Sequence, residues 1–140
     1  MRFEYPVAFK RSDDGTEVIS ARDVPEVASQ AKKKENTWFV AEGALQAAIE
    51  YRVLNGLNIP QPSPARRGER LVALPPETAA KAALYMVMRE RGISKLELAR
   101  QLKINEKEVR RMLHPGHSTK IPRIAEVLRS LGRSLRMELI

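Results

Sequence analysis

A segment with three prolines at alternate positions divides the chain into two halves whose apolar residues repeat with different periods. This segment, residues 59–68, reads Ile-Pro-Gln-Pro-Ser-Pro-Ala-Arg-Arg-Gly. Because proline fixes φ and lacks a backbone donor, the segment should be extended, either as a linker or as a strap along a sheet edge. Apolar residues alternate before it and recur every three to four positions after it. The sequence therefore predicts an α/β domain over residues 1–74, which includes the proline-rich segment, and a helical domain over 75–140.

The start of the chain has the pattern of an antiparallel sheet. Apolar and polar residues alternate over positions 3–9, which predicts a half-buried strand, and Pro6 within it indicates an edge or bulged strand. Residues 12–15, Ser-Asp-Asp-Gly, have the composition of a hairpin turn. We expect the second strand at 16–21 and a third at 27–31.

A helix should follow these strands and end at Asn55, with Gly56 as the residue that terminates it. Its start is open, because Thr37 could be the N-cap or residues 32–36 could form the first turns. Residues 70–74, Arg-Leu-Val-Ala-Leu, have strand character and should pair with the first sheet.

The second half is predicted to be helical up to its last few residues. Helices are expected at 77–91, 95–102, 106–113 and 121–131, where glycine or proline residues mark their ends. Capping boxes, Ser-Lys-Leu-Glu and Asn-Glu-Lys-Glu, precede the second and third of these helices. Leu135, Met137 and Leu139 alternate with charged residues, which predicts a short C-terminal strand that we expect to mediate oligomerisation.

The two short helices at 95–102 and 106–113 have the spacing of a helix-turn-helix unit. Ala99 is small where two helices would cross closely, although Lys103 stands where such units usually have glycine. A row of basic residues on the second helix would face solvent, as a recognition helix in the major groove requires. The predicted DNA-binding residues are Ser94, Lys95, Asn105, Lys107, Arg110, Arg111, His114, Thr119 and Lys120.

Charge is distributed unevenly and supports a nucleic-acid partner for the second half. Residues 1–64 hold 8 Lys/Arg against 9 Asp/Glu, whereas residues 65–140 hold 17 against 8, a net charge of +9. Such an excess favours binding to a polyanion, because each neutralised phosphate releases condensed counterions. The alternative is a basic surface that is merely solvated.

Few residues could carry catalysis or hold a cofactor. The chain has no cysteine, the two histidines are separated by Pro115-Gly116, and Asp13-Asp14 lies in the predicted turn. The seven glycines are scattered singly and form no phosphate-binding loop. We therefore expect no catalytic residue, no metal site and no cofactor. The N-terminus lacks the apolar run of a signal peptide, and no apolar stretch approaches the length of a membrane span, so we expect a soluble cytoplasmic protein without a membrane partner.

The order of several short motifs resembles the HicB antitoxins of type II toxin–antitoxin modules. These motifs are Tyr5-Pro6-Val7, Asp14-Gly15, Asp23-Val24-Pro25, Ile59-Pro60-Gln61-Pro62-Ser63 and the C-terminal helix-turn-helix pattern. The resemblance implies an N-terminal partial RNase H-like domain with one or two helices, which binds and occludes HicA, a ribonuclease that cleaves mRNA. It also implies a C-terminal domain that binds operator DNA as a homodimer or homotetramer.

The sequence thus predicts an α+β protein that is an antitoxin and the repressor of its own operon, and not an enzyme. The alternative is a one-component transcriptional regulator whose N-terminal domain senses a small molecule. A nuclease is the third reading, but the first strand offers only Glu4 as a metal-binding carboxylate.

Overall fold

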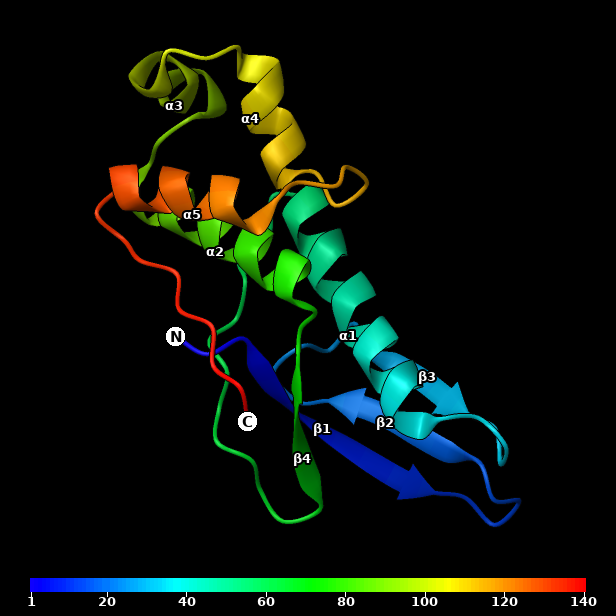
Figure 1. Ribbon diagram of the computed structural model, residues 1–140. Helices are drawn as coiled ribbons and strands as arrows, with labels where there is room; N and C mark the ends of the chain where they lie inside the picture. Colours follow the sequence, from blue (N-terminus) through cyan, green and yellow to red (C-terminus); the bar gives the residue numbers. More distant parts are fainter. The chain divides into compact units, whose positions relative to one another are not determined.

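The computed structural model describes residues 1–140 and divides them into two compact units (Figure 1). Unit 1 comprises Met1–Arg52 and Ile59–Pro75, and unit 2 comprises Val53–Asn58 and Pro76–Ile140. The elements in chain order are β1 (Glu4–Arg11), β2 (Glu17–Ala21), β3 (Ala28–Ala31), α1 (Thr37–Leu54), β4 (Glu69–Ala73), α2 (Pro76–Arg91), α3 (Lys95–Leu102), α4 (Glu106–Leu113) and α5 (Ile121–Ser130). This confirms the predicted α+β class. No helix is long and apolar enough to cross a membrane.

Unit 1 is built on a four-stranded antiparallel sheet in the order β3-β2-β1-β4. The turn between β1 and β2 ends at Gly15, which has a φ of 86°. Glycine adopts this positive φ readily because it has no Cβ to clash with the backbone. β4 pairs with β1 in the register Tyr5↔Val72, so the predicted pairing of this strand with the first sheet is confirmed.

The prediction that β1 is an edge or bulged strand is wrong, because it lies between β2 and β4 with continuous registers on both sides. The ladder with β2 starts at Val7, whereas Pro6 is opposite Leu71 of β4. Pro6 therefore lies beyond the end of the β2 ladder, where its missing N–H removes no hydrogen bond to that strand.

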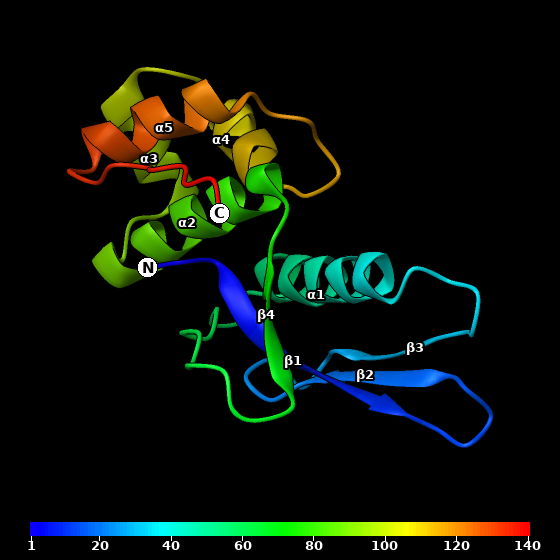
Figure 2. The same cartoon turned by 60° about the horizontal axis from the view of Figure 1, so that its bottom comes forward.

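Residues 37–52 of α1 cover one face of this sheet (Figure 2). The helix starts at Thr37, and the amide side chain of Asn36 accepts a hydrogen bond of 3.2 Å from the N–H of Phe39. Asn36 is therefore the N-cap, and neither a Thr37 cap nor a start within residues 32–36 is correct. Apolar side chains of α1 and of the strands form the core of the unit, among them Tyr5, Val7, Ile19, Ala41, Leu45, Ile49 and Val72.

The proline-rich segment is a strap that belongs to unit 1 and has no helix or strand before residue 69. The buried hydroxyl of Tyr5 donates a hydrogen bond of 2.8 Å to the carbonyl oxygen of Pro60, and burial raises the pKa of this hydroxyl. Ser63 donates to Asp23 through its N–H at 2.6 Å and its hydroxyl at 2.7 Å. Burial opposes the charge of Asp23, but the hydrogen bonds from Ser63 and the nearby charges of Arg22 and Arg66 together keep the pKa of this carboxyl below its usual value.

Unit 2 consists of helices that surround one apolar core. α3 packs on α4, and α2 packs on α4 and α5. The bounds predicted for α3 and α4 are confirmed to the residue, and the other helices differ from prediction only at their ends. The core contains fully or almost fully buried side chains from every helix, among them Leu84, Leu98, Val109, Met112, Ile124 and Val127.

The turn between α3 and α4 is closed by a left-handed residue. Lys103 has φ 55° and ψ 44° and is the only residue other than glycine with positive φ. The N–H of Ile104 reaches back to the carbonyl of Ala99 at 3.0 Å, as in a Schellman motif. The turn thus has the geometry for which such units commonly use glycine.

Replacing Lys103 by glycine should raise the free energy of unfolding by about 0.5–1 kcal/mol, because glycine adopts this conformation without the Cβ penalty. Urea denaturation followed by circular dichroism measures the change. Lys107→Gly, an exposed position within α4, is the control and should lose about 1 kcal/mol. A loss of stability in Lys103→Gly would show that the left-handed lysine carries no strain.

The predicted C-terminal strand is absent, because residues 133–140 form no regular structure and pair with no strand. Alternation of apolar residues favours a strand only where a partner supplies backbone hydrogen bonds, and this chain supplies none for the tail. Leu135 packs against the core of unit 2, whereas Met137 and Leu139 are exposed.

Candidate nucleic-acid interface

α4 is held by its cap and by one apolar face, which leaves the opposite face to solvent. The side-chain oxygen of Asn105 accepts a hydrogen bond of 2.8 Å from the N–H of Lys107, rather than from Glu108 as the predicted capping box requires. Val109, Met112 and Leu113 are buried against the rest of unit 2. The predicted outward row is present, since Lys107, Arg110, Arg111 and His114 are all exposed.

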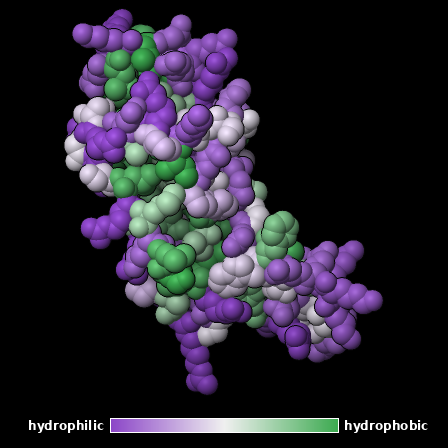
Figure 3. Space-filling model, viewed as in Figure 1, coloured by the Kyte–Doolittle hydropathy of each residue, from purple (hydrophilic) through white to green (hydrophobic).

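The basic residues of this row differ in whether a carboxylate already neutralises them. Arg110 makes an ion pair of 2.9 Å with Glu106 one turn earlier. Lys107, Arg111 and Lys120 make no ion pair within the chain. These three cations are therefore available to an external anion without loss of an internal contact, and Figure 3 shows mainly hydrophilic surface at this end of unit 2.

The start of α3 lies in the same unit and carries two further predicted residues. The Ser94 hydroxyl accepts a hydrogen bond of 3.1 Å from the N–H of Glu97 and so caps α3. Lys95, the first residue of the helix, is exposed. Ser94 thus has a structural role in the chain, while the Lys95 ammonium is free to approach a phosphate near a helix N-terminus.

A buried lysine that sequence reasoning missed organises the end of α4 and the loop that follows it. Lys81 of α2 is 4% exposed. Its Nζ donates to the carbonyl oxygens of Arg111 at 3.3 Å, of His114 at 2.6 Å and of His117. The ammonium therefore satisfies carbonyl groups that a helix leaves without partners at its C-terminus, where a positive charge is also favoured by the helix dipole.

Glu77, one turn before Lys81, fixes the far end of this loop. Its carboxylate accepts a hydrogen bond of 2.9 Å from the N–H of Thr119, and its Oε1 lies 3.9 Å from Nζ of Lys81. The hydroxyl of Thr119 donates to the Arg111 carbonyl at 3.4 Å. Both donors of Thr119 are thus used inside the protein, whereas the ammonium of Lys120 makes no ion pair within the chain.

The two histidines make contacts within the same loop. The N–H of Gly116 donates a hydrogen bond of 2.9 Å to Nδ1 of His114, and the rings of His114 and His117 meet edge to face at 5.1 Å. A Cβ on Gly116 would lie 2.9 Å from Cε1 of His114, so a larger residue there would displace the His114 ring. No group of three His, Cys, Asp or Glu side chains in the chain could hold a metal ion.

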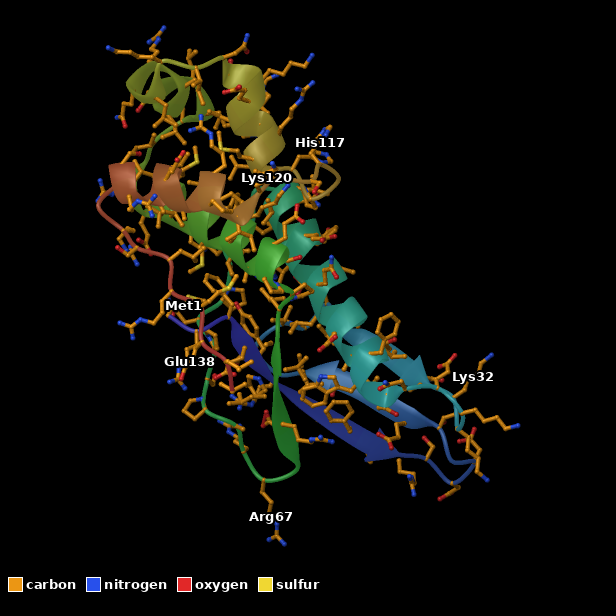
Figure 4. The ribbon with its side chains drawn as sticks, in the orientation of Figure 1. Met1, Lys32, Arg67, His117, Lys120 and Glu138 are labelled. Carbon is orange, nitrogen blue, oxygen red and sulfur yellow. The ribbon has the colours of Figure 1, made fainter.

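These contacts place the predicted residues in three groups. Lys107, Arg110, Arg111 and His114 lie along α4, Ser94 and Lys95 start α3, and Asn105 caps α4. Thr119 and Lys120 belong to the loop before α5, where His117 and Lys120 lie close together beside the end of α4 (Figure 4). An outward helix with unpaired cations, beside a loop fixed by buried charge, can contact base edges and phosphates at the same time.

Comparisons with known proteins agree on one family. Residues 4–83 match the model of a family described as HicB-like antitoxins of bacterial toxin–antitoxin systems. A protein named Antitoxin HicB 2, from Photorhabdus laumondii subsp. laumondii, is 35% identical over 133 residues, which cover 95% of this chain and 94% of that protein. Antitoxin HicB from Escherichia coli strain K12 is 26% identical over 136 residues, covering 97% of this chain and 99% of that protein. The family match includes all four strands, α1 and the first half of α2.

Proposed function

The chain belongs to the family of HicB-like antitoxins, and we propose that it binds and occludes a HicA-like ribonuclease and represses its own operon. The observation that carries this proposal is the family match, which includes every element of unit 1. Both roles are binding functions, so the chain needs no catalytic activity of its own. We expect a cytoplasmic protein, because both proposed targets, an mRNA-cleaving enzyme and operator DNA, lie in that compartment of a bacterium.

Unit 1 is the part that we assign to the ribonuclease, because the family match ends before α3. Inhibition would be steric, since covering the surface on which the enzyme holds RNA excludes the substrate. An RNA cleavage assay with the HicA-like ribonuclease that we propose as the partner tests the inhibition. Addition of a stoichiometric amount of the full chain should stop cleavage, and full activity in an excess of folded chain would reject it.

Unit 2 is the part that we assign to the operator. α3 and α4 have the length and the short connection of a helix-turn-helix unit, and α4 would enter the major groove. Arginine on that helix can donate two hydrogen bonds to a guanine edge, whereas Lys95 and Lys120 are placed at helix starts where phosphate contacts are common. Repression would follow from occupancy of the operator.

Specific binding further requires two recognition helices about 34 Å apart, so we propose a homodimer or a dimer of dimers. The tail with Leu135, Met137 and Leu139 is the proposed contact, because it has no strand partner within the chain and Met137 and Leu139 are exposed, while Leu135 packs on the core of unit 2.

Removal of residues 133–140 should lower the oligomeric state and weaken operator binding. Light scattering gives the mass, and DNA titration gives the affinity. The variant Met137→Ser/Leu139→Ser keeps the full length of the tail and replaces only two exposed apolar side chains. It therefore separates the loss of apolar contacts from the loss of chain length. A truncated protein with unchanged mass and unchanged affinity would refute the role of the tail.

A further inference from the structure

The exposed side of α1 lacks charge along its whole length. Five residues of this helix are exposed, and all are uncharged: Phe39, Gly43, Ala47, Tyr51 and Leu54. Phe39 is the most exposed of them at 72%. The opposite side of the helix already packs on the sheet through Ala41, Leu45 and Ile49. The outward face of a surface helix normally carries charged or polar residues, so a row of uncharged residues on this face marks it as a candidate interaction surface.

Glu42 and Glu50 lie beside this face, whereas Arg52 lies on the sheet-packing side, three residues after Ile49. All three charged residues of α1 are held by neighbouring side chains. Glu42 accepts a hydrogen bond of 2.9 Å from Nε1 of Trp38, and Glu50 accepts one of 2.8 Å from Gln46. Arg52 forms an ion pair of 2.8 Å with Glu26. The face is therefore bordered by two carboxylates that no cation of α1 neutralises.

Gly43 lies in the middle of the face, and nothing within the chain requires a glycine at this position. A Cβ built at this position would meet no atom within 4 Å, and the residue has an ordinary helical backbone rather than a positive φ. Glycine weakens the interior of a helix relative to alanine, so neither packing nor conformation explains its presence. A position without a side chain does, however, allow the backbone of another molecule to approach closely.

We propose that the exposed face of α1, centred on Gly43 and anchored by Phe39, is the surface that docks on the ribonuclease. This inference rests on the proposed antitoxin function. An enzyme that cleaves mRNA must present cationic groups to the phosphates of its substrate. Glu42 and Glu50 beside an apolar face complement such a surface, because the carboxylates pair with its cations while the apolar residues exclude water.

A second copy of this chain is a poorer occupant of the same face. Two α1 helices packed antiparallel around Gly43 and Ala47 would bring the Glu42 and Glu50 carboxylates of both copies into the same interface. Like charges facing each other at an interface oppose association. The charge pattern therefore favours a basic enzyme over self-association through α1.

Substitutions in the full chain test the docking face by titration against the HicA-like ribonuclease that we propose as the partner. Gly43→Gln and Phe39→Gln should each weaken binding at least tenfold. The melting temperature of Gly43→Gln should not fall, because glutamine favours a helix more than glycine does. Val18→Gln, a similar change at an exposed position of β2, is the matched control and should alter affinity less than twofold.

The outcomes separate the docking face from the function on which it rests. If the unsubstituted chain does not inhibit the ribonuclease, the proposed function fails. If the unsubstituted chain inhibits and both Gly43→Gln and Phe39→Gln inhibit equally well, the function stands and the docking face is refuted. A lower mass of Gly43→Gln in light scattering, with unchanged ribonuclease affinity, would assign the face to a second copy instead.

Discussion

Replacing Lys81 by methionine should lower the free energy of unfolding by about 3 kcal/mol, because the buried ammonium is lost and three partly buried carbonyl oxygens lose their donor. Methionine has nearly the same length and volume, so the change removes the ammonium and leaves the packing. The carbonyls of Arg111, His114 and His117 would then face an apolar side chain. Urea denaturation of the full chain measures the loss.

Lys95→Met is the matched control for this substitution. Lys95 is an exposed lysine of the same unit, and its replacement should change stability by no more than about 0.5 kcal/mol. Equal effects of the two substitutions would show that the carbonyl contacts of Lys81 contribute nothing. At a temperature where Lys81→Met remains folded, we also expect weaker operator binding per folded molecule. The end of α4 and the loop that leads to Lys120 would no longer be held by the hydrogen bonds of the Lys81 ammonium.

Replacing Arg110 and Arg111 together by alanine should weaken binding to the operator by at least tenfold, with a smaller effect on random DNA. At least one of the two guanidinium groups is expected to contact a base edge, a contact that contributes roughly 1–3 kcal/mol of specificity. Arg111 should account for more of the loss than Arg110, because Arg110 is already paired with Glu106.

Lys120→Ala is the comparison that separates base contacts from phosphate contacts. This substitution should weaken binding to operator and random DNA equally and reduce the slope of log K against log salt by about one unit. Titrations of both DNAs at several salt concentrations provide all these values. Equal losses on the two DNAs for the arginine variants would make α4 a phosphate-binding helix, with sequence read elsewhere.

Local signals in the sequence were sufficient to predict α3, α4 and the exposed row on α4. Ser94 and Asn105 are strong N-caps, and Gly92 ends the preceding helix, so the bounds of the short helices depend on neighbouring residues alone. Exposure of Lys107 and Arg111 follows from helical periodicity. The ion pair between Glu106 and Arg110 could also have been predicted, because the two residues are four apart.

Features that depend on distant parts of the chain could not be predicted in this way. Lys81 lies between Ala80 and Ala82, which are both buried. The alanine-rich sequence of α2 therefore does not reveal which face of the helix is buried, or that the Lys81 side chain will be buried with it. The central position of β1 depends on β4, which pairs with it from more than sixty residues away. The tail at 133–140 has the alternation of a strand, but alternation does not reveal whether a partner strand exists.

Separation of ribonuclease inhibition from DNA binding is tested most directly by measuring both on one preparation of the full-length Arg110→Ala/Arg111→Ala variant. The variant should stop RNA cleavage at the same stoichiometry as the unsubstituted chain, because its changes lie in α4 of unit 2. Its operator affinity should fall at least tenfold in the same buffer. Loss of inhibition in parallel with loss of operator binding, in a variant that remains folded, would contradict the assignment of the two functions to different units.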